Sequence, residues 1–242
     1  MPGYLLFRLH GALASWGDIA VGERRPSHGA PTKSAVFGLV AGALGLRRDD
    51  SDALAQLNGG YGFASRVDRA GELVSDFHTA QTAPANVLKG RHVQTRRDEL
   101  TVDDRHDLKT ILSQREYRCD AWATACLWPV GDSARWSLEE LQSALRRPVF
   151  VPYLGRKSCP VDLPLAPVIV TADHPVDALK QAAPDQEYGR MTRMDAGVMY
   201  RWEGPDDARR QQTVERRDAV AHRGRWQFTD RREHVRVEPR EG

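Results

Sequence analysis

The sequence predicts an α+β fold built on a ferredoxin-like unit, which has the order strand, helix, strand, strand, helix, strand. Three observations lead to this prediction. Strand-forming and helix-forming stretches follow that order over residues 1–171, which we expect to form one domain. A polar stretch at about residues 80–115, with charges of both signs, interrupts the order as an insertion. Residues 172–242 have few apolar runs but several short strand candidates, so we expect a small β-rich C-terminal part.

The first half of the unit begins with a strand over residues 3–10, where leucines and aromatic residues favour extended chain. A helix is predicted over residues 32–44, with Thr32 as its N-terminal cap and Gly45 as a left-handed C-terminal cap. A second, shorter helix fits residues 52–57 and is ended by two glycines.

The second half begins with two strands, residues 61–67 and 72–79, separated by a turn-like segment. The insertion that follows is either an extended hairpin or a mobile segment. After it, a strand is predicted over residues 117–128, and an S-x-x-E capping box at Ser137 opens a helix that Pro148 ends. The remaining strand candidates are residues 165–171, 198–202, 226–229 and 233–237.

Composition limits the class of protein. Of the 242 residues, 40% are hydrophobic, and the mean hydropathy is −0.55, which allows a folded core. The longest apolar run, residues 35–46, is shorter than the roughly 20 residues that a membrane span needs. The N-terminus also lacks the basic region and the cleavage site of a signal peptide. We therefore expect a cytoplasmic protein with no membrane partner.

Positive charge is concentrated in two stretches, although the net charge of the chain is only +2. Residues 1–48 carry six basic and two acidic side chains, and residues 144–160 carry four basic and no acidic ones. Of the 35 basic residues, 30 are arginine, whose planar guanidinium makes paired hydrogen bonds to phosphate. Genomic base composition is an alternative cause of this excess. If the two stretches meet in space, they predict a site for a polyanion.

The first basic constellation lies before and at the start of the predicted 32–44 helix. Arg24 and Arg25 precede it, and Thr32, Lys33 and Ser34 stand at its first turn. Because a helix N-terminus presents unpaired N–H groups and a partial positive charge, a phosphate fits there. The alternative is an ordinary capped helix with a solvated lysine. The P-loop pattern is absent.

The second constellation is a basic turn near residue 155. Tyr153 is placed to stack on a nucleobase, Gly155 to form the turn, and Arg156 and Lys157 to meet a phosphate backbone. The alternative is a surface loop whose tyrosine packs inward.

The third constellation is Arg115, Tyr117 and Arg118, at the start of the predicted 117–128 strand. It is either a further contact for a polyanion or a salt-bridged strand edge.

Signals for catalysis, metals and cofactors are weak. The sequence has no H-E-x-x-H and no G-x-S-x-G motif. The three cysteines form no C-x-x-C pair and are expected to be core residues. His78 is a candidate general base, but a structural or exposed histidine explains it as well. We predict no catalytic residue, no metal site and no cofactor.

Three motifs in the same order resemble the CasD family, a subunit of the type I-E CRISPR Cascade complex and part of the repeat-associated RNA-binding (RAMP) superfamily. They span about residues 4–165, and the tail beyond residue 172 is outside the resemblance. The motifs are Trp16-Gly17 through Arg25-Pro26, Pro31-Thr32-Lys33-Ser34 and Gly38 to Leu46; Arg115-Glu116-Tyr117-Arg118-Cys119-Asp120; and Pro152-Tyr153-Leu154-Gly155-Arg156-Lys157-Ser158-Cys159-Pro160.

The resemblance implies a ferredoxin-like (RRM-like) domain with an inserted β-hairpin, called the thumb. Members of the family grip the 5′ handle of CRISPR RNA (crRNA) and cap the Cascade backbone subunits. They contact the large subunit that reads the protospacer-adjacent motif (PAM), and so act indirectly on target DNA. The type I-E members are structural RNA-binding subunits and do not cleave the repeat.

Carried onto this sequence, the resemblance predicts a cleft for single-stranded RNA between the helix start and the basic turn. The insertion 80–115 corresponds to the thumb. The cleft residues would be Arg25, Thr32, Lys33 and Ser34 facing Tyr153, Arg156 and Lys157, and the RNA-facing charges of the thumb would be Lys89, Arg91, Arg96 and Arg97.

Two other functions are weighed against this hypothesis. Relatives in another CRISPR subtype are metal-independent endoribonucleases, and His78, Tyr153 and Lys157 are the candidate residues for such chemistry here. A ferredoxin-like domain that binds a small molecule is the third hypothesis, and no glycine-rich cofactor motif supports it.

Overall fold

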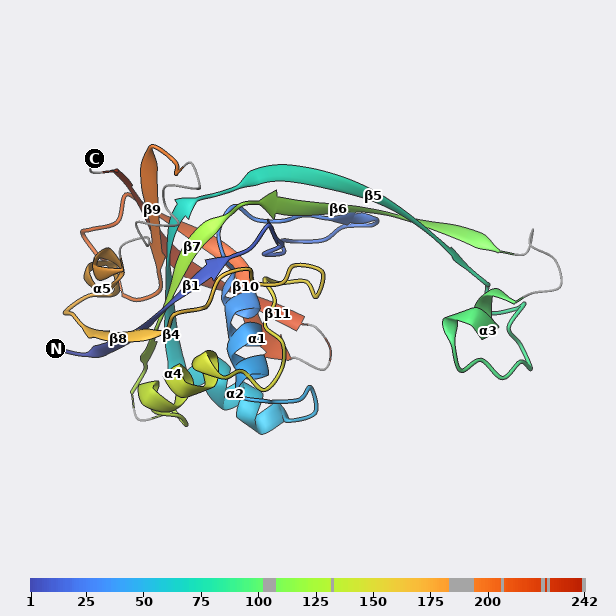
Figure 1. Cartoon of the computed structure of the whole chain (residues 1–242), viewed down its shortest axis with the longest axis horizontal. Coiled ribbons are helices and arrows are strands. Elements are labelled where there is room, and N and C mark those ends of the chain that lie inside the picture. Colours follow the sequence, from blue (N-terminus) through green and yellow to red (C-terminus); the bar gives the residue numbers. More distant parts are fainter. Residues whose placement is uncertain are drawn as a thin grey trace.

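The computed structural model describes residues 1–101, 108–131, 133–182, 194–205, 207–222, 225 and 227–240. A seven-stranded antiparallel sheet forms the body, in the order β10-β11-β9-β4-β7-β1-β8. A long two-stranded hairpin projects from this body (Figure 1). The mixed α and β content that the sequence predicts is confirmed. The strands of the body are β1 (Gly3–His10), β4 (Tyr61–Arg69), β7 (Trp122–Pro129), β8 (Val168–Thr171), β9 (Gly197–Trp202), β10 (Gln212–His222) and β11 (Gln227–Pro239).

The central strands are buried on both faces. In β1, Leu5 and Phe7 pack with the core that α1 (Lys33–Ala43), α2 (Ser51–Gly60) and α4 (Leu138–Arg146) cover. The alternate residues of β1 pack on the other side of the sheet, against α5 (Pro175–Gln181). Because side chains alternate along a strand, a run of apolar residues such as that of β1 fits a strand with a core on each side.

The start of α1 differs from the prediction in one respect. Thr32 is the N-cap residue, but its side chain does not cap the helix, because its hydroxyl donates to the backbone oxygen of Trp16 at 2.6 Å. The carboxylate of Asp218, far along the chain, accepts from the first helical N–H, that of Lys33, at 2.8 Å. Gly45 follows the helix with φ +77°, as predicted for its left-handed cap.

Two helices show how far local signals reach. The capping box at Ser137 is confirmed, since the Ser137 hydroxyl accepts from the N–H of Glu140 at 3.1 Å and the Glu140 carboxylate accepts in return at 2.7 Å. In contrast, α2 continues through both glycines that were expected to end it, and β4 begins directly after it.

The projecting hairpin is longer than the predicted insertion. Its strands, β5 (Glu72–Thr82) and β6 (Lys109–Cys119), pair in one register along their whole length. The hairpin therefore leaves the body at Glu72, returns at Cys119 and contains the predicted insertion at about residues 80–115. The tip carries α3 (Arg96–Leu100). Two short strands, β2 (Leu13–Ala14) and β3 (Arg24–Arg25), pair with β6 at the hairpin's base.

The predicted strand over residues 117–128 is two strands. The extended conformation is interrupted between β6 and β7 at Asp120, whose φ of 53° lies in the left-handed region. β6 belongs to the hairpin and β7 to the centre of the body sheet. Apolar and aromatic residues on both sides of Asp120 concealed this interruption.

The segment after residue 172 extends the same sheet, since β9 pairs with β4. The two strand candidates over residues 226–229 and 233–237 are one strand, β11, and Trp226 lies outside the described residues. Of the cysteines, Cys126 and Cys159 are buried and Cys119 is half-buried. Among the helices of the described segments, none is both long and apolar enough to cross a membrane.

Candidate nucleic-acid interface

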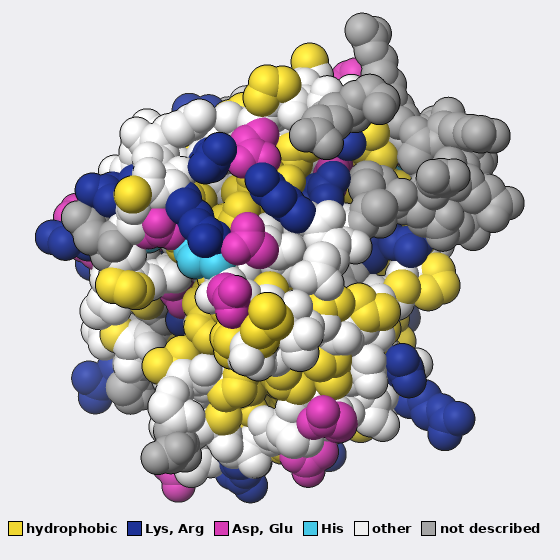
Figure 2. All heavy atoms as spheres, turned by 90° about the vertical axis from the view of Figure 1, so that its left-hand side faces the viewer, with side chains coloured by type: hydrophobic (Ala, Val, Ile, Leu, Met, Phe, Trp, Pro, Cys, Tyr) yellow, Lys and Arg dark blue, Asp and Glu magenta, His cyan; other side chains and the backbone are white. Residues whose placement is uncertain are grey.

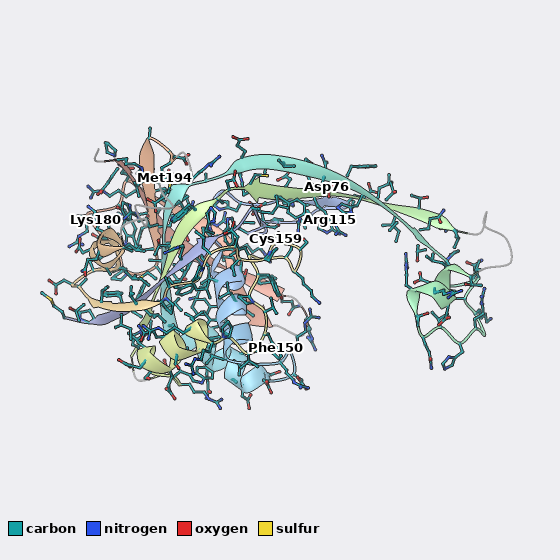
Figure 3. The ribbon with its side chains drawn as sticks, in the orientation of Figure 1. Asp76, Arg115, Phe150, Cys159, Lys180 and Met194 are labelled. Atoms are coloured by element: carbon teal, nitrogen blue, oxygen red, sulfur yellow. The ribbon has the colours of Figure 1, made fainter. Side chains whose placement is uncertain are left out.

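A large cleft of about 1550 Å³ lies beside α1. Its walls come from segments far apart in the sequence: residues 15–20, α1, the loop after α4 and the β10–β11 hairpin. The loop begins alongside the end of α1, where the N–H of Phe150 donates to the Gly42 oxygen at 3.1 Å. From there it runs toward Cys159, near the base of the projecting hairpin (Figure 3), where the Arg156 guanidinium donates to the Glu116 oxygen. The cleft therefore joins the two basic stretches that the charge distribution singled out.

The start of α1 contributes only part of its predicted set. Thr32 and Ser34 line the cleft, and their hydroxyl oxygens lie 3.5 Å apart. Lys33 is not among the lining residues. Its ammonium group donates to the Glu203 carboxylate at 2.9 Å, and its side chain is mostly buried. Lys33 is thus part of an internal ion pair, and we leave it out of the proposed contact set.

Lys33 belongs to a buried network that joins α1 to the C-terminal strands. The Arg231 guanidinium donates to Asp218 at 2.6 Å and to Glu233 at 2.8 Å. Burial alone would raise the pKa of Asp218, but the hydrogen bonds and charge of Arg231 outweigh it and hold that pKa below its ordinary value. The carboxylate therefore stays charged. It occupies the place at the helix start where a phosphate was predicted to bind.

The basic turn is built around a glycine. Gly155 has φ +84°, and a Cβ at this position would overlap the carbonyl oxygen of Ser15. Leu154 is fully buried and its oxygen accepts from the Ser15 N–H at 3.0 Å, whereas Tyr153 is 43% exposed. The turn is therefore anchored at its centre and presents its tyrosine outward. Lys157, also exposed, lines the same cleft.

Arg156 joins the turn to the base of the projecting hairpin. Its guanidinium lies over the Tyr117 ring at 4.9 Å from the centroid. It donates to the backbone oxygens of Glu116 at 3.1 Å and Arg25 at 3.0 Å. Tyr117 is buried, so the structure places it beneath Arg156 and not in open contact with solvent. Arg156 therefore positions the turn as well as lining the cleft.

The third predicted constellation, at the end of β6, contacts the loop before α1. The Glu116 carboxylate accepts from Arg24 Nη2 at 2.6 Å and from the Ser27 N–H at 3.2 Å. These hydrogen bonds, that of Arg24 first, lower the pKa of Glu116. Arg118 is half-buried and its guanidinium points at the backbone oxygen of Ser27 at 3.4 Å. Arg24 and Arg118 thus brace the loop before α1.

A second, smaller hollow of about 330 Å³ lies under the hairpin. Arg25 and Arg115 line it together with His78, whose Nε2 lies beside the Asp76 carboxylate. Asp76 and Arg115 face each other across the two strands (Figure 3). His78 therefore lies in a different hollow from Tyr153 and Lys157, the other two candidates for repeat cleavage.

The four predicted thumb charges lie at the tip of the hairpin, and all are exposed. Arg91 donates to the backbone oxygen of Thr101, and Arg96 to that of Gln81. Two of these arginines thus help to hold the tip together. The other two predicted charges of the tip are Lys89 and Arg97.

Sequence reasoning missed the contribution of the C-terminal strands to the cleft. Arg216 and Arg217 on β10 line it, as do Arg47 and Arg48 after α1. The available signal was the arginine-rich tail, but no local pattern indicated that β10 meets a helix that begins at residue 33. On the face turned away from the hairpin tip, by contrast, basic side chains lie among acidic ones (Figure 2). Lys180 with Glu238 and Arg209 with Asp177 are partly exposed ion pairs of the C-terminal part.

Comparison with known proteins identifies the family. The family model described as "CRISPR-associated protein (Cas_Cas5)" matches residues 4–234. The CRISPR system Cascade subunit CasD of Escherichia coli (strain K12) is 35% identical over 185 residues, which cover 76% of this chain and 79% of that protein. The chain belongs to the Cas5 family of CRISPR-associated proteins. The resemblance to CasD that the motifs indicated is confirmed.

Solved structures agree with this assignment to the Cas5 family. A chain of a structure described as "CRISPR RNA-guided surveillance complex" superimposes with a TM-score of 0.62 and 26% identity, covering 98% of this chain and 89% of that one. A second, described as "Crystal structure of Cas protein", gives a TM-score of 0.58 at 24% identity, covering 98% and 94%, and shows the fold alone. The alignments extend over the C-terminal strands that the motifs did not reach.

Proposed function

We propose that this Cas5-family chain is the crRNA-binding subunit of a type I-E Cascade complex and that it grips the 5′ handle of crRNA in the cleft beside α1. The observation that carries the proposal is the meeting of Tyr153, Arg156 and Lys157 with the start of α1 across one cleft. An exposed aromatic ring beside cations suits a single strand, whose bases stack while its phosphates pair with the cations.

The fold supports this proposal. Strands β4-β7-β1-β8 are antiparallel neighbours, and α1 and α4 pack on one face of them. This order is the one expected of a ferredoxin-like (RRM-like) unit over residues 1–171, and we propose that correspondence. The C-terminal strands β9, β10 and β11 would then be an addition to one edge of that unit.

We further propose that the β5–β6 hairpin is the thumb, with Lys89, Arg91, Arg96 and Arg97 toward the RNA. Its exposed position on the body suits a segment that reaches a neighbouring subunit or strand (Figure 1). The Cascade backbone subunit and the large PAM-reading subunit are the protein partners proposed with this function.

The proposed role is structural and not catalytic. The competing endoribonuclease hypothesis needs a base, a tyrosine and a lysine at one scissile phosphate. The separation of His78 from Tyr153 and Lys157 into two hollows does not favour it. Repeat RNA incubated with the chain in EDTA is expected to stay intact on a denaturing gel, and a single discrete cut would contradict the proposed role.

Binding is tested with end-labelled CRISPR repeat RNA and the full chain. The double variant Arg156→Ala/Lys157→Ala is expected to weaken binding by about 100-fold or more, because two charge-assisted contacts of about 1.5–3 kcal/mol each are lost. The matched control is Arg146→Ala/Arg147→Ala, which removes the same charge from exposed residues that do not line the cleft. Equal affinity of the two double variants would sink the assignment of the cleft.

A further inference from the structure

Strand β10 is irregular between Arg216 and Ala219, and again between Val220 and His222. Its pairing with β11 is in register up to Arg216 and shifts by one before Ala219, so that Arg217 and Asp218 together stand opposite Asp230. Two residues against one make a β-bulge, a feature that redirects side chains and often lies next to a functional site. The bulge therefore takes Arg217 and Asp218, which directly follow Arg216, out of the normal alternation of a strand.

The bulge borders the large cleft. Arg216, Arg217 and Asp218 all line it, although a regular strand turns only every second side chain to one side. The ion pair between Arg217 and Asp230 is 3.8 Å long, and both side chains are more than half exposed. Such a surface pair contributes little, so it does not hold Arg217 away from a ligand.

Asp218 fixes the bulge to the body. It is 5% exposed, and its carboxylate accepts from the Lys33 N–H at 2.8 Å and from Arg231 Nε at 2.6 Å. The first contact attaches β10 to the start of α1, whose Ser34 lines the same cleft. The positions of Arg216 and Arg217 relative to α1 therefore depend on one buried side chain.

The buried network around Asp218 contains equal numbers of both charges. Lys33, Arg201 and Arg231 are its cations, and Glu203, Asp218 and Glu233 are its anions. Its basic groups are thus neutralised within the chain. Arg217 and the preceding Arg216 are outside these ion pairs, although the charge of Arg216 helps to lower the pKa of Asp218.

We propose that the bulge of β10 is a phosphate-binding element of the cleft, in which Arg216 and Arg217 contact the RNA backbone and Asp218 is the positioning residue that fixes them to α1. This inference rests on the proposed function, because it requires RNA in the cleft. It assigns a role to a C-terminal segment that the sequence motifs did not cover.

The affinity of the full chain for end-labelled CRISPR repeat RNA, measured against salt concentration, tests the two arginines. Each phosphate contact on a single strand contributes about 0.7 to the slope of log affinity against log salt. Arg216→Ala/Arg217→Ala is expected to make that slope shallower by about 1.4 and to weaken binding about tenfold. The control Arg146→Ala/Arg147→Ala leaves the slope unchanged.

Asp218→Asn tests the positioning role. It is expected to make the slope shallower by a similar amount, and adding it to the double arginine variant produces no further change in slope, since the same contacts are already lost. The matched control is Asp68→Asn, which removes another fully buried carboxylate, paired with Arg66 and Arg240, away from the cleft. A merely structural role would lower the unfolding temperature in both variants and leave both slopes intact.

The outcomes separate the two levels of the argument. If Arg216→Ala/Arg217→Ala binds like the unchanged chain while Arg156→Ala/Lys157→Ala binds weakly, the role of the bulge is overturned and the proposed function stands. If both double variants bind like the unchanged chain, both fail. If Asp218→Asn does not fold, the arginine variant alone decides whether the bulge contacts RNA.

Discussion

The start of α1 and the basic turn at residues 153–157 look equivalent in the sequence, but the structure treats them differently. At the start of α1, the closed site, the Lys33 ammonium donates to Glu203 and the Lys33 N–H donates to Asp218, so carboxylates of this chain already occupy both groups. At the turn, the open site, Lys157 and Tyr153 remain exposed at the cleft. The comparison teaches that a basic residue indicates a ligand only if no distant carboxylate has already paired with it.

The largest expected effect is a loss of stability when the turn of the open site is disrupted. Gly155→Ala forces a Cβ into the carbonyl oxygen of Ser15 at a left-handed φ, so we expect a loss of about 3–4 kcal/mol in unfolding free energy. Urea unfolding measures it. Gly131→Ala is the control, because its φ of +59° carries the same backbone strain with no heavy atom within 4 Å. Equal losses for both variants would show that close packing at the turn is unimportant.

A somewhat smaller effect is expected at the closed site. Lys33→Ala leaves Glu203 with one cation fewer in a buried network, and we expect a loss of about 3 kcal/mol. Its salt slope for RNA binding should stay at the level of the unchanged chain. A shallower slope would mean that Lys33 contacts RNA after all.

The dependence of stability on pH provides a third test, through His28 in the loop before α1. Burial first, and then the positive charges of Arg216 and Arg201, lower the pKa of His28 to about 4. The N–H of Ala30 donates to its Nδ1, which suits the neutral ring. Since the unfolded pKa is near 6.5, the unfolded chain binds the proton first, and stability falls as pH drops from about 6.5 to 4. We expect about 2 kcal/mol of this fall to be absent in His28→Gln, and identical urea profiles at pH 7 and pH 4.5 for both chains would contradict it.

The smallest expected effect on stability accompanies a specific effect on binding. Lys157→Ala removes an exposed cation from the open site, so the unfolding free energy should change by less than about 0.5 kcal/mol. The salt slope should become shallower by about 0.7, which is one phosphate contact. Lys33→Ala and Lys157→Ala thus form a pair with opposite readouts, and the comparison fails if they behave alike.

Features set by neighbouring residues could be predicted, and those set by distant ones could not. The capping box at Ser137 and the left-handed Gly45 depend on residues within one turn, and both are confirmed. The pairing of Lys33 with Glu203 depends on a residue 170 positions away. The break at Asp120 was hidden for a related reason, since only the partners of β6 and β7 show that they belong to different sheets.

The candidate site was predicted in part. The motif residues of the turn, with Thr32 and Ser34, meet at one cleft as expected. The wall formed by β10 was not expected, because arginines in a tail of short strands give no information about the surface they will face. Residue spacing predicts contacts only within one helix or strand, whereas the cleft is formed by α1 and β10, which lie far apart in the sequence.

The two strands that leave the body at Glu72 and return at Cys119 have a mechanical consequence. β4 continues into β5 through two residues, and β7 is joined to β6 by two residues. Both pairs, β4 with β7 and β5 with β6, are hydrogen-bonded. A force on the distant tip is therefore carried along one continuous ribbon into the middle of the sheet. The joint contains Gly71 and Asp120, both at positive φ, and a Cβ at Gly71 would lie 2.6 Å from the carbonyl oxygen of Cys119, so the two strands bend together where their backbones pack closely.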